Sequence, residues 1–284
     1  MSAPYFSLVV PTIGRSAEVE ALLHSIDRST FRDFEVVIVD QNSDDRLYAV
    51  VAKFDGRFPI RHMKIEGRGA ARARNLGAAI VTGNFVNFPD DDCEFFPGSL
   101  AMAYELIESR QLRVLSGVSI DRHEGVSTTF FKKGECMLTP WSMWGRNIEF
   151  TMFFDREVFR DAGGFDERFG VGSRYGSDEG AELLLRLVRG LGAARGWYTD
   201  RLRFYHPSKT LNFDDAAIQR SFSYARGNGA LLAKWPMLPV IVFSFRLVSR
   251  ACIGALMFSG SKRRYYAARA RGFLNGWREF LREG

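Results

Sequence analysis

Several features that mark other protein classes are scarce or missing in this chain of 284 residues. The three cysteines, Cys93, Cys136 and Cys252, lie far apart. They form neither a metal-ligand spacing nor a disulfide framework, and this suits a reducing compartment. The N-terminus has no basic start and runs directly into an apolar strand pattern, so we expect no signal peptide. With no internal repeat or low-complexity stretch, the composition is that of an ordinary globular protein.

The glycine-rich turns of two common nucleotide-binding classes are also missing. A dinucleotide site would place a G-x-G-x-x-G turn after the first strand, but residues 10–15 hold one glycine. The G-x-x-x-x-G-K-[ST] phosphate loop does not occur either. The sequence therefore argues against an NAD site and against a P-loop.

What the chain does have is an alternation of strand and helix patterns. Short apolar or β-branched runs predict strands, and apolar residues at helical spacing predict helices. The predicted strands are 6–12, 35–40, 60–65, 85–88 and 112–120. The predicted helices lie around 19–26 and at 70–80, 97–110, 156–162 and 179–189. Strands that alternate with helices predict an α/β fold with a mixed, mostly parallel sheet.

The charge is distributed unevenly along the chain. Residues 201–284 hold fifteen Lys or Arg and four Asp or Glu, a net charge of +11, whereas the whole chain carries +6. Residues 1–200 therefore carry −5, and after about residue 212 the pattern becomes helical and basic. We expect a nucleotide-binding domain over residues 1–210. Residues 211–284 are expected to form a helical, basic, amphipathic tail with a polyanionic partner.

The most apolar window, residues 235–260, is interrupted by Arg246 and Arg250. Its uncharged runs are about eleven residues long, shorter than the roughly twenty that a membrane-spanning helix needs. A helix in the bilayer interface fits better, because Lys262-Arg263-Arg264 lies beside the window. We expect attachment to an anionic membrane surface. The alternative is a helix packed on the domain with a solvated basic face, and the window is too apolar for a nucleic-acid track.

Three consecutive carboxylates, Asp90, Asp91 and Asp92, follow the strand predicted at 85–88. Adjacent carboxylates repel, and each raises the pKa of the others unless a positive charge lies between them. A hard divalent cation is the usual counter-charge, and open α/β sheets bind ligands at the carboxyl ends of their strands. The triplet therefore predicts a metal site with a phosphate-bearing ligand; a solvated acidic turn is the alternative.

Further candidate binding residues follow the other strands. Asp40 ends the second predicted strand, where a carboxylate can accept a hydrogen bond from a base N–H or a ribose hydroxyl. Arg68, Arg72 and Arg74 surround the start of the helix predicted at 70–80, a position that favours phosphate. The plainer alternatives are a helix cap after Asp40 and a basic helix on the surface.

These residues, taken in order, resemble the family-2 glycosyltransferases with a GT-A fold, the bacterial inverting enzymes of polysaccharide assembly. The segments that carry the resemblance are Pro11-Thr12, Asp40, Ala73-Arg74-Asn75-x-Gly77, Asp90-x-Asp92, Gly164-Phe165-Asp166-Glu167 and 175–186. The match covers roughly residues 6–210, and the remainder resembles the membrane-proximal helical tails of some members. The resemblance implies one GT-A type nucleotide-binding domain with a C-terminal helical basic extension.

The resemblance also implies roles for single residues. Asp40 would face the nucleobase, commonly uracil, and Arg74 would approach the donor phosphate or sugar. Asp90 and Asp92 would hold Mg²⁺ or Mn²⁺, with Asp92 the more direct ligand and His206 a further one; a structural role is the alternative for His206. The residues assigned to the nucleotide pocket are Pro11, Thr12, Arg15, Asp40, Arg68, Arg74, Asn75, Asp90 and Asp91, the last without a separate role.

The catalytic base would come from Asp178-Glu179, but the family pattern does not align there without ambiguity. The usual pattern is Glu-Asp, one residue, then an acid before Leu. Counting back from Arg186 puts Glu179 on the first acid and Gly180 on the usual Asp. Glu182 then lands on the later acid, whereas a shift of one residue aligns Asp178-Glu179 with the pair. Glu179 is the preferred base and Asp178 the second candidate, while Glu182 stays open.

The implied reaction is inverting transfer of a sugar from a nucleoside-diphosphate donor, UDP by preference. The acceptor would be a hydroxyl of a glycan or of a polyprenyl-diphosphate-linked sugar, in exopolysaccharide biosynthesis. We expect a peripheral enzyme on the cytoplasmic face of the cell membrane. Two alternatives stay open. A sugar nucleotidyltransferase would release pyrophosphate, although its Gly-rich, Lys-bearing first loop is missing here. A non-catalytic membrane scaffold would bind nucleotide without transferring sugar.

Overall fold

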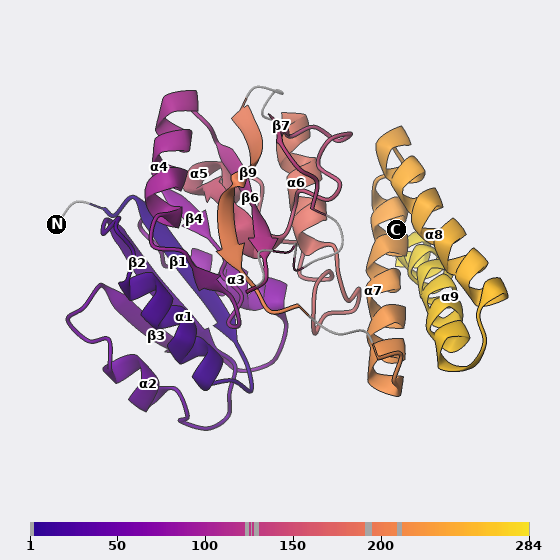
Figure 1. The fold of residues 1–284 in the computed structure, drawn as a ribbon, viewed down its shortest axis with the longest axis horizontal. Coiled ribbons are helices and arrows are strands. Elements are labelled where there is room, and N and C mark those ends of the chain that lie inside the picture. The colour runs from indigo at the N-terminus through magenta and orange to yellow at the C-terminus, as the bar shows by residue number, and fades with distance from the viewer. Residues whose placement is uncertain are drawn as a thin grey trace. The chain divides into compact units, whose positions relative to one another are not determined.

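The structure, a computed structural model, describes residues 3–122, 125, 127, 131–190, 195–208 and 212–283 (Figure 1). Its strands are β1 (Phe6–Thr12), β2 (Phe34–Asp40), β3 (Ile60–Lys64), β4 (Phe85–Asn87), β5 (Glu94–Phe95), β6 (Val114–Ile120), β7 (Glu135–Met137), β8 (Met152–Asp155) and β9 (Gly196–Tyr205). Its α-helices are α1 (Ala17–Asp27), α2 (Tyr48–Ala52), α3 (Ala70–Ala78), α4 (Ser99–Arg110), α5 (Arg156–Asp161), α6 (Glu179–Gly190), α7 (Asp215–Lys234), α8 (Leu238–Met257) and α9 (Gly260–Glu283). A 3-10 turn, η1 (Glu149–Thr151), precedes β8.

The strands form one mixed sheet in the order β3-β2-β1-β4-β8-β6-β9-β5, with β7 paired to β9. The first four strands in that order are parallel, and β8 runs antiparallel to both of its neighbours. The prediction of a mixed sheet in an α/β domain is confirmed, and so are the five predicted strands. Strands β5, β7, β8 and β9 were not predicted.

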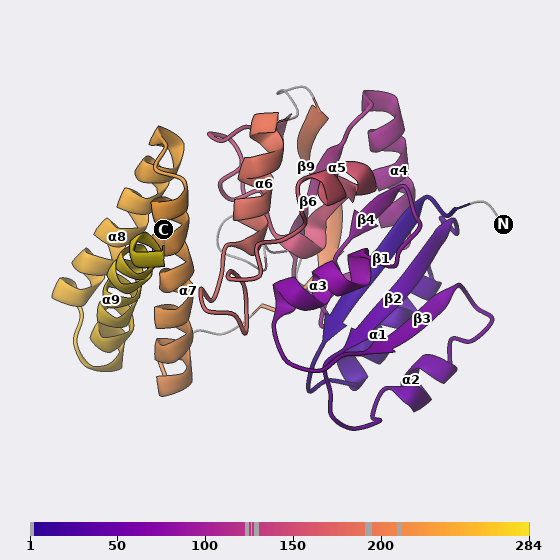
Figure 2. The same cartoon turned by 180° about the vertical axis from the view of Figure 1, so that it is seen from behind.

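The core lies on both faces of the sheet because every residue of β1 and β2 is buried. Side chains alternate between the two faces of a strand. On one face, Leu8 and Val10 join a cluster with residues of α1, α2 and α4. Helix α3 packs on the opposite face, where a Cβ on Gly77 would come within 2.8 Å of Val39 Cγ2. Figures 1 and 2 show these two helical layers from opposite sides.

The chain divides into two compact units. The sheet unit contains residues 1–165 and 183–208. The helical unit contains residues 166–182 and 209–284. The domain boundary predicted after residue 210 stays a prediction. The division adds that residues 166–182 belong to the same compact unit as the helical tail.

The helical unit is built from α7, α8 and α9, in agreement with the predicted helical tail. Helix α7 begins at an Asp214 cap, whose side chain accepts a hydrogen bond from Ala217 N at 2.7 Å. Glycines let α9 lie directly on the backbone of α7: a Cβ on Gly272 would be 3.0 Å from the Phe222 carbonyl carbon. A Cβ on Gly276 would be 2.7 Å from the Arg226 carbonyl carbon. The two helices therefore pack closely in a way that larger residues would prevent.

Candidate active site

The predicted binding residues of the sheet unit lie at one edge of the sheet. Strand β1 ends at Thr12 and its parallel neighbour β2 at Asp40, and the two residues are in register. Strand β4 is also parallel to β1 and leads into Asp90 through Phe88-Pro89. Because parallel strands end at the same edge, these polar groups are brought together as the sequence predicts.

Two arginines pair with the acidic triplet. Arg74 NH2 lies 2.9 Å from Asp90 Oδ1, and the Arg74 side chain is buried. Arg15 NH1 pairs with Asp91 and lies 2.8 Å from Asp92 Oδ2. The positive charges expected between adjacent carboxylates are thus present in the protein itself.

Asp91, which had no separate predicted role, anchors two residues of the β1 loop. Thr12 Oγ1 donates to Asp91 Oδ2 at 2.8 Å, and Arg15 donates to Asp91 Oδ1. Burial raises the pKa of Asp91 to about 6, although Arg15 and the Thr12 hydroxyl act in the opposite direction. Pro11 is buried within β1 beside this anchor. Asp91 therefore holds the predicted nucleotide loop in place.

Asp90, Asp92 and His206 form a group that could hold a metal ion, because one ligand atom of each lies within 4.8 Å of the others. His206 Nε2 lies 3.4 Å from Asp92 Oδ1, and the imidazole stacks on Phe150 with ring centroids 5.2 Å apart. His206 Nδ1 is buried and has no hydrogen-bond partner among the described residues. The two carboxylates suit Mg²⁺ or Mn²⁺, and the imidazole offers one further nitrogen ligand. The residues present therefore fit a divalent cation.

Asp40 is fully buried, and its carboxylate is already engaged. Asp40 Oδ1 accepts hydrogen bonds from the backbone and side-chain nitrogens of Asn42, at 2.8 and 2.7 Å. Asp40 Oδ2 lies 2.9 Å from His62 Nε2. The sequence predicted neither partner, because His62 lies on β3 in no recognisable motif.

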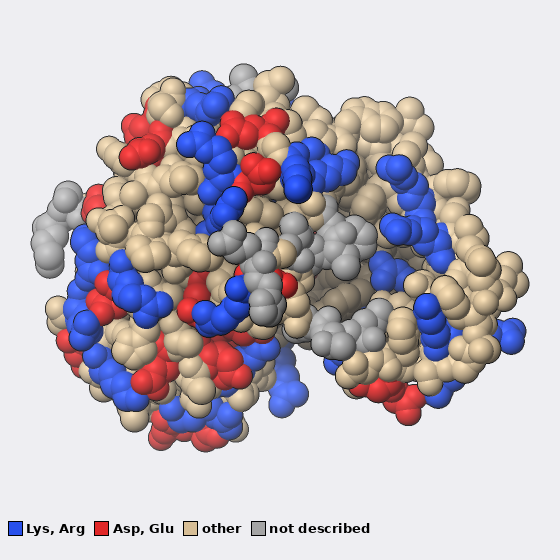
Figure 3. All heavy atoms as spheres, in the orientation of Figure 1, with Lys and Arg blue, Asp and Glu red and all other residues tan. Residues whose placement is uncertain are grey.

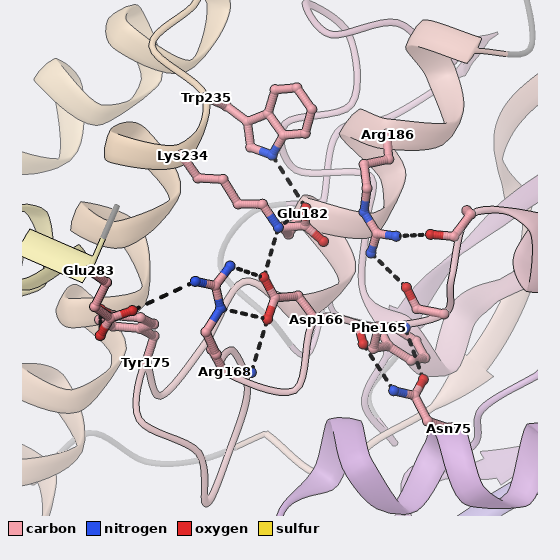
Figure 4. Close-up of polar contacts among 12 residues, drawn as sticks. Asn75, Phe165, Asp166, Arg168, Tyr175, Glu182, Arg186, Lys234, Trp235 and Glu283 are labelled. Carbon is pink, nitrogen blue, oxygen red and sulfur yellow. Dashed lines mark hydrogen bonds and ion pairs between the residues drawn. The ribbon is translucent and has the colours of Figure 1, made fainter. Parts of the chain in front are cut away.

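The α3 motif serves the fold as well as the pocket. Asn75 Oδ1 accepts from Phe165 N and Asn75 Nδ2 donates to Phe165 O, both at 2.9 Å (Figure 4). Arg186 donates to the carbonyls of Ala162 and Gly164 in the same turn. Both ends of the Asn75 amide thus hold the Gly-Gly-Phe turn, a contact that the predicted nucleotide role did not include. Arg68, in contrast, is exposed at the start of α3.

The helical unit holds the three candidate bases on residues 166–182. Asp178 is half-buried and has φ +70°, a left-handed conformation uncommon outside glycine. Its Oδ2 atom accepts hydrogen bonds from Ser177 Oγ at 2.7 Å and from Asn228 Nδ2. Burial raises the pKa of Asp178 to about 6, with the neighbouring Glu179 charge adding to the rise, while Ser177, Asn228 and Arg269 lower it.

The other two acids of this segment are buried. Glu179 is 5% exposed and lies beside Gly170, where a Cβ would be 2.8 Å from Glu179 Cδ. Glu182 is 0% exposed, and its Oε1 lies 2.6 Å from Lys234 Nζ and 3.4 Å from Trp235 Nε1 (Figure 4). Glu182 is therefore paired with a cation of its own unit.

Comparison with known proteins places the chain in a family. The sequence model described as "Glycosyl transferase family 2" matches residues 7–164, more than half of the chain. The chain belongs to glycosyl transferase family 2. The family match covers Thr12, Asp40, Arg74 and the Asp90–Asp92 triplet. It ends before residues 166–182, which carry the candidate bases, and before His206.

Several curated relatives of this family 2 chain come from bacteria. It is 40% identical over 103 residues to an uncharacterized glycosyltransferase of Haemophilus influenzae, covering 36% of this chain and 34% of the relative. It is 30% identical over 134 residues to a GalNAc(5)-diNAcBac-PP-undecaprenol beta-1,3-glucosyltransferase of Campylobacter jejuni, covering 46% and 43%. A PGL/p-HBAD biosynthesis glycosyltransferase of Mycobacterium bovis is 30% identical over 177 residues, with 60% and 67% covered. The matches thus span less than half the length of the first two relatives.

Solved structures share the whole fold at low sequence identity. TarS 1–349 of Staphylococcus aureus covers 99% of this chain and 92% of its own, with a TM-score of 0.60 and 18% identity. The mannosyltransferase PcManGT of Pyrobaculum calidifontis, solved with GDP-Man and Mn²⁺, covers 99% and 88% with a TM-score of 0.65 and 16% identity. These likenesses confirm the GT-A fold class.

Proposed function

We propose that this protein is an inverting, divalent-cation-dependent glycosyltransferase that uses a nucleoside-diphosphate sugar, UDP-linked by preference. The observation that carries the proposal is the group of Asp90, Asp92 and His206 at the sheet edge where family 2 membership leads us to expect the donor. The Mn²⁺ in the PcManGT structure supports the same chemistry.

The residues of the sheet unit would bind and orient the donor. A Mg²⁺ or Mn²⁺ ion held by Asp90, Asp92 and His206 would stabilise the departing diphosphate as a Lewis acid. Arg15 and Arg74 are placed to exchange part of their pairing with the triplet for donor phosphate oxygens, because guanidinium groups bind both anions. Thr12 would contact the nucleoside, and Asp40, which is buried against Asn42 and His62, would do so by exchanging one of these partners for a base N–H.

The residues of the helical unit would move the proton. An acidic side chain takes the proton of the acceptor hydroxyl as that oxygen attacks the anomeric carbon and the bond from that carbon to the diphosphate oxygen breaks. A single displacement of this kind inverts the anomeric configuration. Asp178 and Glu179 stay as candidates for this base. Burial and the ion pair with Lys234 support a structural role for Glu182 instead.

A screen of nucleoside-diphosphate sugars tests this proposal. Purified full-length protein is incubated with each donor and Mn²⁺ or Mg²⁺, and released nucleoside diphosphate and labelled product are measured. We expect release from one donor class that stops on addition of EDTA and returns with metal. Pyrophosphate release from a nucleoside triphosphate would support the nucleotidyltransferase instead, and nucleotide binding without any turnover would support a scaffold.

For the acceptor we propose a polyprenyl-diphosphate-linked sugar or glycan at the cytoplasmic membrane face. By length and composition alone, helix α8 could cross a membrane, with a mean hydropathy of 1.8 and 28% of that window buried. Arg246 and Arg250 interrupt it, however, and this favours the interfacial position predicted from the sequence. The exposed apolar residues of α8 recur at helical spacing: Leu238, Ile241, Val242, Phe245, Ile253, Leu256 and Met257. Phe245 and Leu256 are 71% and 84% exposed. Figure 3 shows blue Lys and Arg side chains beside a broad tan area over this helical unit.

The exposed apolar stripe of α8 and the basic side chains beside it together support an interfacial position. Arg246 and Arg250 are exposed within α8, and Lys262-Arg263-Arg264 follows at the start of α9. Basic side chains beside an apolar stripe bind anionic lipid headgroups while the stripe enters the acyl boundary. The Campylobacter relative is named for a sugar chain linked to undecaprenol through PP, and this supports a lipid-linked acceptor for the present chain.

Vesicle flotation tests the membrane proposal. The full-length protein should float with vesicles of phosphatidylcholine and phosphatidylglycerol and stay in solution with phosphatidylcholine alone. Phe245→Glu and Leu256→Glu should abolish flotation, while Trp141→Glu, an exposed aromatic of the sheet unit, should not. Flotation of the two α8 variants at the wild-type level contradicts the proposal.

A further inference from the structure

Residues 166–182 decide where the candidate bases lie, and they form one compact unit with α7–α9. Helix α7 contacts this segment at its beginning, its middle and its end. Lys234 makes the contacts at both ends of the segment, and residues 223–228 of the helix make the contact at its middle.

Lys234, at the end of α7, ties the two ends of the segment together. Its Nζ lies 2.7 Å from Asp166 Oδ2 and 2.6 Å from Glu182 Oε1 (Figure 4). Asp166 also accepts a hydrogen bond from Arg168 NH2 at 2.8 Å. Although burial acts in the other direction, the hydrogen bonds from Arg168 and Lys234 hold the pKa of Asp166 well below its usual range. One ammonium group therefore closes the segment into a loop.

The middle of the segment lies directly on the α7 backbone. A Cβ on Gly227 of α7 would be 2.6 Å from the Ser177 carbonyl oxygen. A Cβ on Gly176 would be 3.0 Å from the Ser223 carbonyl carbon. Neither glycine can gain a methyl group unless α7 and residues 176–177 move apart.

Asn228, next to this contact, reaches the Asp178 carboxylate. Its Nδ2 atom and Ser177 Oγ both lie within hydrogen-bond distance of Asp178 Oδ2. Ser177 Oγ also lies 2.8 Å from Tyr224 O and has one proton to donate, whereas the amide of Asn228 has two. The charged groups that act on Asp178 are Glu179 of its own segment and Arg269 of α9.

We propose that α7 is a positioning element of the active site, in which Lys234 closes the acidic segment and Asn228 orients the Asp178 carboxylate. This rests on the proposed sugar transfer, because it assigns the segment a part in that reaction. It makes the helical tail a component of the catalytic apparatus in addition to its proposed membrane role.

A methyl group at Gly227 tests the contact with the least disturbance elsewhere. Alanine favours a helix over glycine, so Gly227→Ala does not weaken α7 itself. We expect turnover to fall by about 10²-fold, because displacement of a catalytic group by about 1 Å costs this much. UDP affinity should stay unchanged, and hydrogen exchange of residues 166–182 should become faster. Gly190→Ala is the matched control. Gly190 is the last residue of α6, and a Cβ added there would meet nothing within 4 Å.

Asn228→Leu tests the link to the carboxylate. The variant removes a hydrogen-bond donor to the ionised Asp178 carboxylate and should therefore raise the pKa of Asp178. In a plot of kcat/KM against pH, the acidic limb should then move to higher pH by about one unit. Gln219→Leu makes the same change at an exposed position of α7 and should leave the profile unmoved. An unmoved acidic limb in Asn228→Leu overturns the role of Asn228. Wild-type turnover in Gly227→Ala, or equal losses of turnover and UDP affinity, overturns positioning by α7.

Hydrogen exchange separates this inference from the proposed function. The segment contains backbone hydrogen bonds such as Gly170 N to Tyr175 O at 2.7 Å, so exchange reports its order without any reaction. If the wild type transfers no sugar but Gly227→Ala still speeds exchange, the proposed function fails and the holding of the segment by α7 stands. If the wild type transfers sugar and Gly227→Ala changes neither exchange nor turnover, the inference fails and the function stands.

Discussion

The two acidic regions of this protein differ in the groups that face their carboxylates. In the sheet unit, Arg74 and Arg15 lie against the Asp90–Asp92 triplet. In the helical unit, the neutral donors of Ser177 and Asn228 face Asp178. The triplet thus pairs directly with guanidinium groups, whereas Asp178 accepts hydrogen bonds from neutral donors, with the Arg269 charge acting on it as well. Asp166 and Glu182 of the helical unit pair with Lys234 instead.

The partners of the carboxylates distinguish metal and phosphate binding from proton transfer better than the pKa values of Asp91 and Asp178 do. Burial raises the pKa of Asp91 and of Asp178 to about 6, so both acids titrate in the same range. An acid paired with cations is suited to exchange one cation for another, as metal and phosphate binding require. An acid held by neutral donors and titrating near neutral pH is suited to exchange a proton.

The largest expected effect separates the candidate bases within the helical unit. Glu179→Gln and Asp178→Asn are compared in initial rates of sugar transfer. The variant that removes the base should lose about 10²- to 10⁴-fold in kcat, and the other much less. Glu105→Gln, an exposed acid on α4, is the control. Full rates in both variants would place the base outside this segment and break the comparison.

Removal of a metal ligand tests the sheet unit. Asp92→Ala should lower transfer by roughly 10³-fold, since the cation supplies several kcal/mol of charge stabilisation. It should also abolish Mn²⁺ binding by calorimetry, whereas Glu179→Gln should bind Mn²⁺ normally. An Asp92→Ala protein with wild-type activity and an unchanged metal requirement would falsify the assignment.

Loss of the Lys234 charge tests whether Glu182 is structural. Lys234→Met leaves a fully buried carboxylate without this cation and should lower the free energy of unfolding by about 3–5 kcal/mol. The double variant Lys234→Met/Glu182→Gln removes both charges of this pair and should recover the part of the loss that comes from Glu182, while Asp166, which also loses Lys234, keeps Arg168. Urea unfolding measures both variants, and equal losses in the single and double variants would show that Glu182 does not depend on Lys234.

The smallest effect is a pH dependence of stability set by Asp178. Its pKa is raised from 3.8 to about 6 in the folded protein, so the unfolded chain releases this proton at lower pH. Stability from this group is therefore present below about pH 4 and is lost as the pH rises to 6. Asp178→Asn should stabilise the protein by about 1–2 kcal/mol at pH 7.5, after allowance for partial exposure, and by less at pH 4.5. Thermal unfolding at the two pH values measures the difference, and an equal gain at both contradicts it.

The local sequence pattern predicted the buried strands of the sheet unit better than it predicted the side-chain contacts between them. The runs that became β1 and β2 are apolar throughout, and both strands are fully buried. Strand β9 mixes aromatic and charged residues, and its pairing with β6 joins segments about eighty residues apart, so no local signal marked it. The partners of Asp40 and the contact of Asn75 with Phe165 likewise depend on distant segments.

The sequence by itself determined the edge of the sheet where the ligand residues gather. Buried β-branched runs form strands, parallel strands end at the same edge, and Thr12, Asp40 and Asp90 follow from their places along those strands. Only the tertiary structure decided that residues 166–182 belong with the tail. Lys234 and Gly227 contact that segment from about fifty residues further along the chain. Hydrophobic periodicity predicts the helix or strand that each segment forms, but it does not predict which distant segments pack together.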